Sequence, residues 1–259
     1  MQLYCILPLV MASYKYKMTI AYDGTHYGGW QVQPNAPSIQ ALIEHALGVI
    51  LRLPIPIIGS GRTDAGVHAL GQIAHFVTDN PIDISKTIAS LNGMLSDEIR
   101  ILEIIEVPLN FHARYSALSK TYHYRLHLKK IPDPFNKHYA YHVPHPVDVD
   151  LLKEAASQFI GVHDFTSFAN EACRGTAAKD AMRTLHRLDI VEEPGGVRLE
   201  FEGDGFLYKM VRNIVGTLLD ICAGKIDKEQ IPKIFSKKDR RLAGRTAPPH
   251  GLYLVAVKY

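Results

Sequence analysis

Apolar positions recur at two spacings in the first half of the chain, and they predict alternating strands and helices. Residues 15–22 alternate apolar and polar side chains, which is typical of a half-buried strand. Ile39 and Ile43 begin a run at helical spacing, and Ser38 before them is a suitable N-cap for a helix over 39–51. The same patterns predict strands at 55–60, 70–77 and 99–107 and a helix at 83–95.

The second half repeats this order around an irregular interruption. Four prolines within residues 129–147 predict an irregular connection. Pro194-Gly195-Gly196 separates two strand-like segments and predicts a hairpin. Strands are predicted at 118–128, 181–192, 197–202 and 252–258, and helices at 150–160, 206–223 and 228–235.

The order of these elements predicts an α+β protein with mostly antiparallel sheets. Each half follows a pattern near β-α-β-β-α-β. We therefore divide the chain into an N-terminal half at 15–110 and a C-terminal half at 111–259, preceded by an extension at 1–14.

The composition argues against a disulfide-rich or cysteine-zinc protein, but it does not indicate one function. The chain has 259 residues, of which 47% are hydrophobic, enough for one large domain or two of ordinary size. The net charge of +3 is compatible with nucleic acid but does not require it. Cys5, Cys173 and Cys222 form no CxxC pair, which argues against a disulfide framework or a cysteine zinc site and favours a reducing cytosol.

The first residues are apolar but fit neither a membrane span nor a secretory signal. Residues 3–12 are too few to cross a bilayer, and no basic residue precedes them. We therefore expect no membrane association and favour a true start at Met11 or Met18 rather than Met1. A weak export signal is the alternative.

Residues 61–69 read Gly-Arg-Thr-Asp-Ala-Gly-Val-His-Ala and place Asp64 between two glycines, beside Arg62. Glycine permits close approach of the backbone and unusual turns. A guanidinium next to a carboxylate favours the ionised carboxylate. The segment therefore predicts a loop that presents Asp64, supported by Arg62, to a ligand. The alternative is an ordinary turn aspartate that caps its own loop.

Two further segments combine aromatic and polar side chains. Residues 23–31 contain the only tryptophan, Trp30, and either line a cleft or form a turn whose tryptophan packs at the domain edge. On the strand at 118–128, Tyr122 and Tyr124 share a face, opposite a face of His and Arg. Such a strand suits RNA, because bases stack on rings and phosphates attract cations. A core face of Tyr and Leu is the alternative.

Polar and basic residues accompany these segments in both halves. Asn213 lies in an otherwise apolar helix, where it either holds the Asp64 loop or caps a buried carbonyl. Arg240 and Arg241, with Arg245, form a basic cluster that on its own indicates solvated surface. We expect several cations to converge on one cleft and contact phosphates, namely Arg62, Arg114, Lys120, Arg125, Lys209, Arg212 and Arg245.

Thirteen histidines raise the question of a metal site. His138, His142 and His145 come closest to ligand spacing, but Pro144 and Pro146 break any helix that would align them. Neither an HExxH nor an HxE…CxxC signature occurs. We therefore expect no metal.

Six segments, in order, resemble the tRNA pseudouridine synthases of the A type, which modify uridines in the anticodon stem-loop. The resemblance extends from about Tyr16 to Tyr259 and leaves the first 14 or so residues unmatched. The segments are 23–33, 61–68, 111–124, 163–168, 205–216 and 251–254.

This resemblance implies two ferredoxin-like (RRM-like) halves that share a mostly antiparallel mixed sheet, with a catalytic cleft between them. It implies that Asp64 is the catalytic aspartate, that Tyr122 contacts the target base and that Arg62 belongs to the active site. Arg212 and Leu252 fall in matched segments and are expected to bind substrate. It also implies a cytoplasmic homodimer that needs no cofactor and acts at tRNA positions 38, 39 and 40.

The implied reaction breaks a C–N glycosidic bond, turns the uracil and rejoins it through C5, so nothing is oxidised. A carboxylate can attack the anomeric carbon or stabilise positive charge there, as in glycosidases. An ester, a glycal and attack on the uracil ring all remain open. A non-catalytic RNA-binding protein and a metal-dependent hydrolase are the rival hypotheses.

Overall fold

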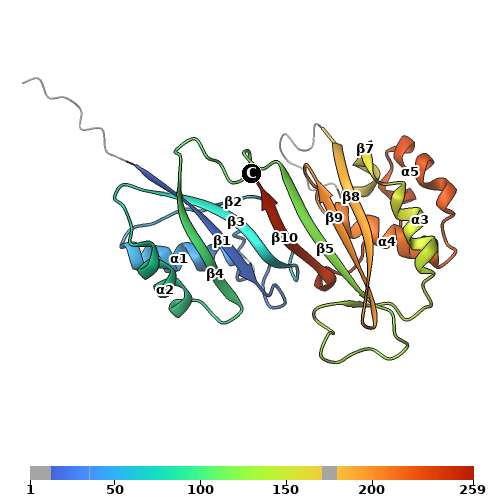
Figure 1. Ribbon diagram of the computed structural model, residues 1–259, viewed down its shortest axis with the longest axis horizontal. Helices are drawn as coiled ribbons and strands as arrows, with labels where there is room; N and C mark the ends of the chain where they lie inside the picture. The colour runs from blue at the N-terminus through green and yellow to red at the C-terminus, as the bar shows by residue number, and fades with distance from the viewer. Residues whose placement is uncertain (1–12, 35, 171–179) are drawn as a thin grey trace, which may run out of the picture.

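The computed structural model describes residues 13–34, 36–170 and 180–259, which form one large sheet with helices packed beside it (Figure 1). The strand order is β4-β1-β3-β10-β5-β9-β8-β7, with β2 paired to β3 and β6 paired to β5. The strands are β1 (Tyr14–Tyr22), β2 (Ile58–Gly59), β3 (His68–Thr78), β4 (Ile99–Val107), β5 (Ser119–His127), β6 (Tyr141–His142), β7 (Gly161–Asp164), β8 (Met182–Glu193), β9 (Gly196–Gly203) and β10 (Leu252–Lys258).

The helices form where the sequence supplies both an apolar face and a cap. Ser38 caps its helix as predicted, since its side chain accepts a hydrogen bond from the N–H of Ala41. Asp83 and Asp148 cap the next two helices in the same way. The α-helices are α1 (Ile39–Leu51), α2 (Ile84–Met94), α3 (Val149–Ser157), α4 (Met210–Cys222) and α5 (Ile231–Lys237). Short 3₁₀ helices lie at Phe165–Phe168, Lys228–Gln230, Arg240–Leu242 and Pro249–Gly251.

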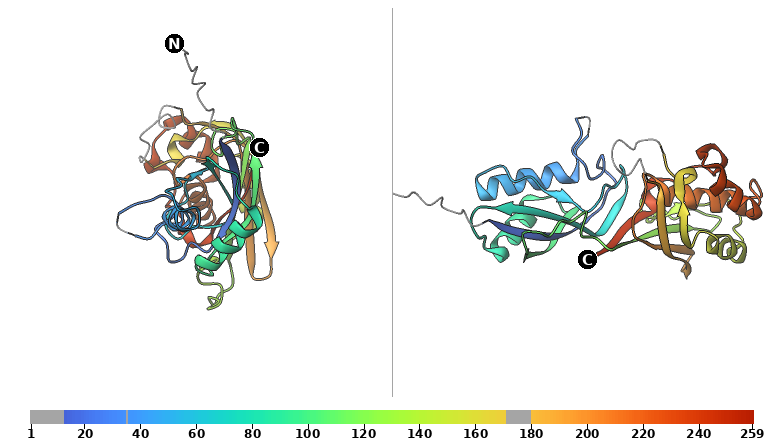
Figure 2. Two further views of the ribbon diagram at one scale, coloured as in Figure 1. Left: turned by 90° about the vertical axis from the view of Figure 1, so that its left-hand side faces the viewer. Right: turned by 90° about the horizontal axis from the view of Figure 1, so that it is seen from above.

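Strand β10 joins the two parts of the sheet. It runs parallel to β3, where Tyr253 pairs with His68, and antiparallel to β5, where Leu254 pairs with Tyr122. Strands from residues before 110 lie on one side of it, and the remaining strands from residues after 111 lie on the other (Figure 2). The predicted α+β class and mostly antiparallel mixed sheet are confirmed. The boundary between the halves stays a prediction.

One predicted helix and one predicted strand are shorter in the structure. The helix predicted over 206–223 begins at Met210, because Lys209 has a left-handed backbone (φ 60°, ψ 10°) that a right-handed helix cannot include. The strand predicted over 55–60 shrinks to β2, since Pro56 has no N–H to donate to a neighbouring strand.

The region after α3 also differs from its prediction. The helix predicted over 150–160 ends at Ser157, and the unpredicted strand β7 follows from Gly161, whose φ of +114° suits glycine. The irregular connection at 129–147 contains the two-residue strand β6.

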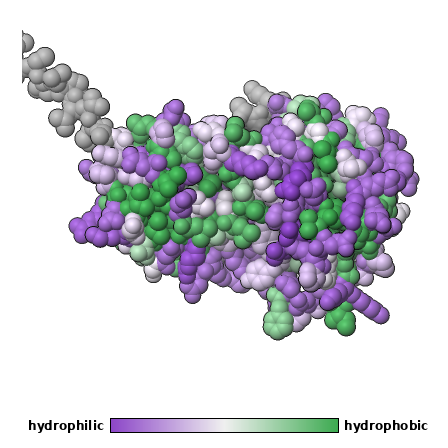
Figure 3. Space-filling model, viewed as in Figure 1, coloured by the Kyte–Doolittle hydropathy of each residue, from purple (hydrophilic) through white to green (hydrophobic). Residues whose placement is uncertain are grey.

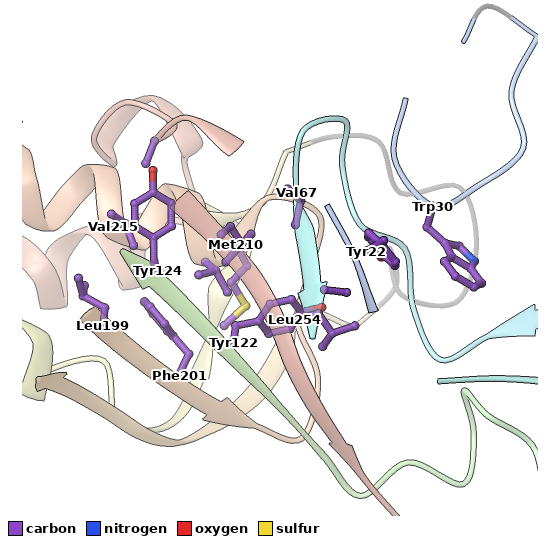
Figure 4. Close-up of a cluster of buried hydrophobic side chains, with 14 of the residues drawn as sticks. Tyr22, Trp30, Val67, Tyr122, Tyr124, Leu199, Phe201, Met210, Val215 and Leu254 are labelled. Atoms are coloured by element: carbon purple, nitrogen blue, oxygen red, sulfur yellow. The ribbon is translucent and has the colours of Figure 1, made fainter. Parts of the chain in front are cut away.

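One continuous apolar core lies under the sheet. Figure 4 shows buried side chains running from Phe201 on β9, past Tyr122 on β5, to Tyr22 and Trp30 in the N-terminal half. The core therefore crosses the junction between the halves, so β10 is held by side-chain packing as well as by its hydrogen bonds.

The outer surface differs between the two ends of the sheet. On the face shown in Figure 3, apolar residues gather toward the β4–β1–β3 end, whereas hydrophilic residues dominate toward β9 and β8. Val77 on β3 is 41% exposed and Leu102 on β4 is 54% exposed. At the other end, Arg187 and Arg198 each lie 2.8 Å from a carboxylate oxygen of Glu200.

Some predictions concern residues that the structure does not describe. Met1 and Met11, and with them the question of the start codon, lie outside the described residues, as do Cys5 and Cys173. Cys222 is a free thiol on α4. Within the described ranges, no helix is long and apolar enough to cross a membrane.

Candidate active site

The Asp64 loop connects β2 to β3 and rests on the glycine-rich loop that follows β1. Gly66 has a φ of +76°, as expected for a glycine that turns this loop. Gly29 has a φ of +95°, and a Cβ there would overlap the carbonyl oxygen of Thr63. The N–H of Trp30 donates to that same carbonyl at 3.1 Å. The residue before Asp64 is therefore fixed by a contact that only glycine permits.

Asp64 pairs with Arg212, from the first turn of α4 in the other half of the chain. Arg212 Nη1 lies 2.5 Å from Asp64 Oδ2. The sequence predicts that Arg62 supports Asp64, and this pairing is wrong: Arg62 Nη1 instead donates to Gln31 Oε1 at 3.1 Å. The two side chains of the Asp64–Arg212 pair are only 20% and 11% exposed. The pair thus joins the halves at a site that is largely, but not fully, buried.

Arg212 is itself held by the segment that follows α5. Its Nε donates to the carbonyl of Ala247 at 2.7 Å, and its own carbonyl accepts from the N–H of Ala247 at 3.0 Å. Gly216, one turn further along α4, lets the segment approach, since a Cβ there would overlap the carbonyl oxygen of Arg245. The orientation of the guanidinium is therefore set by backbone contacts on two sides.

Asn213 belongs to this support and does not touch the Asp64 loop. Its Nδ2 donates to the carbonyl of Phe168 at 2.8 Å, so it caps a buried carbonyl. Its Oδ1 accepts from Thr246 Oγ1 at 2.7 Å and from Arg240 Nη2 at 2.9 Å. Asn213 therefore acts on the pair indirectly, by fixing the residues beside Ala247. The basic cluster also divides here, because Arg240 is built into this network whereas Arg241 is solvated.

Tyr122 lies in the core and also faces the site. Its side chain is 8% exposed, and its ring meets Phe206 edge-on at 4.9 Å between centroids. Burial raises the pKa of its hydroxyl, with smaller contributions from Tyr22 and Asp64. The two alternatives for this residue are therefore compatible: the ring packs on the core and presents its remaining surface to the site.

Several residues that hold the site were not singled out from the sequence. Gln72, fully buried on β3, donates to the carbonyl of Gly61 at 3.0 Å and accepts from Ser60 Oγ at 2.8 Å. The Tyr22 hydroxyl lies 2.8 Å from Thr63 Oγ1, and burial raises the pKa of that hydroxyl to about 12. A polar residue in an otherwise apolar strand is the signal that could have identified Gln72.

One cleft of about 1290 Å³ lies between the halves, and Asp64 lines it. All five predicted site residues face it, namely Asp64, Tyr122, Arg62, Arg212 and Leu252. Trp30 also lines it from a position that is 3% exposed, so the cleft alternative for its loop is correct. The structure therefore brings these five residues together in one cavity, whereas their roles stay a prediction.

The predicted cations divide into two groups. Arg62, Arg114, Lys120, Lys209 and Arg212 line the cleft. Arg125 instead lies over the ring of Tyr253 and near Glu193, and Arg245 lies near Asp220 and Tyr141. Arg183, which the sequence did not single out, joins the cleft group.

The histidines do not gather into a metal site. His142 Nε2 lies 2.9 Å from the carbonyl of Lys129, and the carbonyl of His138 lies 2.9 Å from His68 Nε2. In the described parts of the chain, no group of three His, Cys, Asp or Glu side chains is arranged to hold a metal ion.

Comparison with known proteins gives one consistent family. The family model described as tRNA pseudouridine synthase matches residues 18–116 and 155–259. The chain is 58% identical to tRNA pseudouridine synthase A 1 of Protochlamydia amoebophila, over 94% of this chain and 96% of the relative. It is 45% identical to tRNA pseudouridine synthase A of Acetivibrio thermocellus and 44% identical to that of Bacillus subtilis, in each case over 94% of this chain and 98% of the relative.

Proposed function

The chain belongs to the tRNA pseudouridine synthase family and is an isomerase of uridine in tRNA, and from this premise we propose its site and target. The targets are positions 38, 39 and 40 of the anticodon stem-loop. Asp64 is the catalytic carboxylate, and the reaction uses no cofactor, because no electron or phosphoryl group is transferred. Tyr122, Arg62, Arg212 and Leu252 bind the substrate.

The observation that carries the proposal is the Asp64–Arg212 pair at the floor of the cleft. The reaction breaks the bond between C1′ and N1 of the target uridine and forms one between C1′ and C5. A carboxylate serves either route to this exchange, by attack on C1′ or by stabilising positive charge there. Arg212 holds the carboxylate at 2.5 Å, so its position is set before the substrate enters.

The remaining cleft residues supply the other needs of the reaction. The target base must leave its stack, because C1′ and C5 are inaccessible within a helical stem. The detached uracil has to be retained while it turns, and the Tyr122 ring at the cleft floor offers a face for stacking. The proton on C5 is finally lost and one is gained at N1, which the Tyr122 hydroxyl can relay.

The experiment that tests this proposal is to incubate the protein with unmodified tRNA transcripts and map pseudouridine at each position. We expect it at 38, 39 and 40 where uridine is present, with EDTA in the buffer. Asp64→Asn should bind tRNA but form none. A protein that binds tRNA and modifies nothing would fit the non-catalytic rival, and activity lost with EDTA would fit the metal-dependent one.

We also propose a quaternary structure and a location for the protein from its family membership. We propose a cytoplasmic homodimer, for which the exposed apolar side chains at the β4–β1–β3 end offer a surface. Light scattering coupled to gel filtration should give about twice the 28.9 kDa of one chain. A mass of one chain at micromolar concentration would contradict the dimer.

A further inference from the structure

Three of the cations that line the cleft form a group that we call the cation cluster: Arg114, Lys120 and Arg183. Lys120 comes from β5, Arg183 from β8, and Arg114 from the connection between β4 and β5. All three line the same cleft as Asp64. Three separate chain segments therefore bring positive charge to the cleft, and the charges of Arg114 and Arg183 act on Lys120.

Two glycines make room for members of the cluster. A Cβ on Gly61 would lie 2.8 Å from Lys120 Nζ, and a Cβ on Gly205 would lie 3.2 Å from Arg183 Nε. Lys120 Nζ also donates to the carbonyl of Ser60 at 2.7 Å. The positions of these side chains are thus built into the surrounding backbone, unlike those of ordinary surface cations.

The positive charge of the cluster is not neutralised by the carboxylates nearby. Within residues 13–34, 36–170 and 180–259, no carboxylate oxygen lies within 4.0 Å of a cluster nitrogen. Asp180 and Asp204 line the same cleft but are committed to backbone groups, accepting from the N–H of Met182 at 2.8 Å and of Thr184 at 3.1 Å.

The pKa of Lys120 reflects both its burial and the neighbouring positive charges. Its pKa is lowered to about 8, mainly by burial and further by Arg114 and Arg183. A bound anion would reverse the effect of the like charges, because an opposite charge favours the protonated amine. The cluster therefore offers positive charge that a bound anion can neutralise.

We propose that the cation cluster binds one backbone phosphate of the RNA, at a linkage flanking the target uridine. The inference rests on the proposed function for the identity of the ligand. Lys120 and Tyr122 lie two residues apart on the same strand, about 6.6 Å at the usual rise, so an anion on Lys120 is close to a base on Tyr122. Arginine pairs bind phosphate through several charge-assisted hydrogen bonds at once.

The same phosphate is linked to the Asp64 loop through Lys120. The amine holds the carbonyl of Ser60, the residue before Gly61 at the start of that loop. A substrate phosphate on Lys120 therefore contacts the support of the reacting carboxylate as well as the cleft wall. Lys120 is a positioning residue in this arrangement, since it reaches Asp64 only through the loop.

The test combines protein variants with neutralised RNA linkages. Anticodon stem-loops are made with one uncharged methylphosphonate on the 5′ or the 3′ side of the target, on a 2′-O-methyl sugar. Matched RNAs carry the ordinary phosphate on the same sugar. Binding is measured for the wild-type protein and for the double variant Arg114→Gln/Arg183→Gln.

We expect one neutral linkage to weaken wild-type binding about tenfold, as for loss of a charge-assisted contact. The double variant should bind the ordinary RNA about tenfold more weakly and be indifferent to that linkage. Its binding should also depend less on salt, by about one phosphate contact or 0.7 to 0.9 in the logarithmic slope. Equal losses for both proteins, or no loss at either linkage, would overturn the proposal.

Two controls distinguish a specific phosphate site from a general loss of charge and from misfolding. Arg241→Gln removes one positive charge at a solvated position outside the cleft, where the side chain is 88% exposed, and should leave the salt slope unchanged. Melting temperatures of all variants exclude misfolding. Failure of the wild-type protein to form any pseudouridine would refute the proposed function, whereas an active protein with no linkage effect would refute only the phosphate site.

Discussion

Charge is arranged differently in two parts of the cleft, which we call the floor (Asp64 and Arg212) and the wall (the cation cluster). At the floor, Asp64 and Arg212 neutralise each other at 2.5 Å, and both are largely enclosed by protein. Along the wall, the cation cluster has no such partner among the described residues. The protein therefore neutralises the charge of Asp64 with its own arginine where bonds change. Where the RNA backbone is held, in our proposal, the positive charge of the cation cluster is neutralised by a phosphate of the substrate.

The largest loss of activity is expected when the negative charge of Asp64 is removed. Asp64→Asn is isosteric and local, so we expect folding and tRNA affinity to be nearly unchanged. Single-turnover formation of pseudouridine should fall roughly 10⁴-fold or more. Asp79→Asn, at an exposed turn, is the matched control and should be fully active. Normal turnover by the Asp64 variant would remove this residue from the mechanism.

The second test removes the partner of Asp64. Arg212→Gln leaves the carboxylate without its charged anchor, so we expect the single-turnover rate to fall about 10²-fold. Affinity should fall less, because the cation cluster remains. Arg245→Gln, in a residue outside the cleft that contacts Asp220, should lower the melting temperature at most. A rate that is unchanged in Arg212→Gln would show that the pair is structural.

A third test concerns the ring of Tyr122, which lines the cleft together with Asp64 and Lys120. Tyr122→Phe keeps the stacking surface, so binding should persist, while loss of the proton relay should slow turnover by about 10²-fold. Tyr122→Leu should damage both binding and turnover and lower the melting temperature, because the ring is part of the core.

Tyr124→Phe provides the control for that variant. The Tyr124 hydroxyl donates to the carbonyl of Pro248 at 2.8 Å and does not face the cleft, so its loss should affect stability without affecting the rate. Full activity of Tyr122→Phe would eliminate the relay and leave only the stacking role.

Changes of pH should have a smaller effect, on the binding of RNA by the cation cluster. In the free protein the pKa of Lys120 is about 8, below its ordinary value, and a bound phosphate raises it. Affinity for the stem-loop should therefore be constant below pH 8 and decline above it, where the neutral amine must take up a proton to bind. Lys120→Arg keeps its charge throughout, so its affinity should be flatter from about pH 8 to about pH 9.5 at fixed salt. Parallel declines for both proteins would exclude Lys120 as the titrating group.

Most of the fold could be predicted because its signals are local. The spacing of Ile39 and Ile43 and the cap at Ser38 determine α1 without reference to the rest of the chain. The start of α4 could not be predicted, because the left-handed backbone of Lys209 interrupts a pattern that is helical on both sides. The position of β10 between β3 and β5 was also out of reach of local patterns, since it depends on pairing between distant segments.

The site shows the same limit. Asp64 could be found from the glycines and the arginine around it, but its partner could not, because Arg62 and Arg212 differ only in where the fold places them. The position of Arg183 in the cleft could not be predicted, since nothing in the residues around it distinguishes it from an ordinary surface arginine. The local pattern therefore marks the Asp64 loop as a candidate, whereas the pairing of Asp64 with Arg212 depends on how the fold brings the halves together.

The central position of β10 also determines when the site comes into existence. The strand pairs Tyr253 with His68, so it closes the sheet between segments separated by most of the chain. Contacts of this kind carry a large loop-closure cost and form slowly. At about 5–20 residues per second, roughly 7 to 30 s of synthesis separate the end of β4 from the start of β10. During that interval β2 already pairs with β3, but the part of β3 at His68 and Ala69 has no β10 beside it, and the two sides of the cleft are not yet joined. Assembly of the cleft is therefore a late step in synthesis, and the uncovered end of β3 at His68 and Ala69 is the place where premature association with other chains would begin.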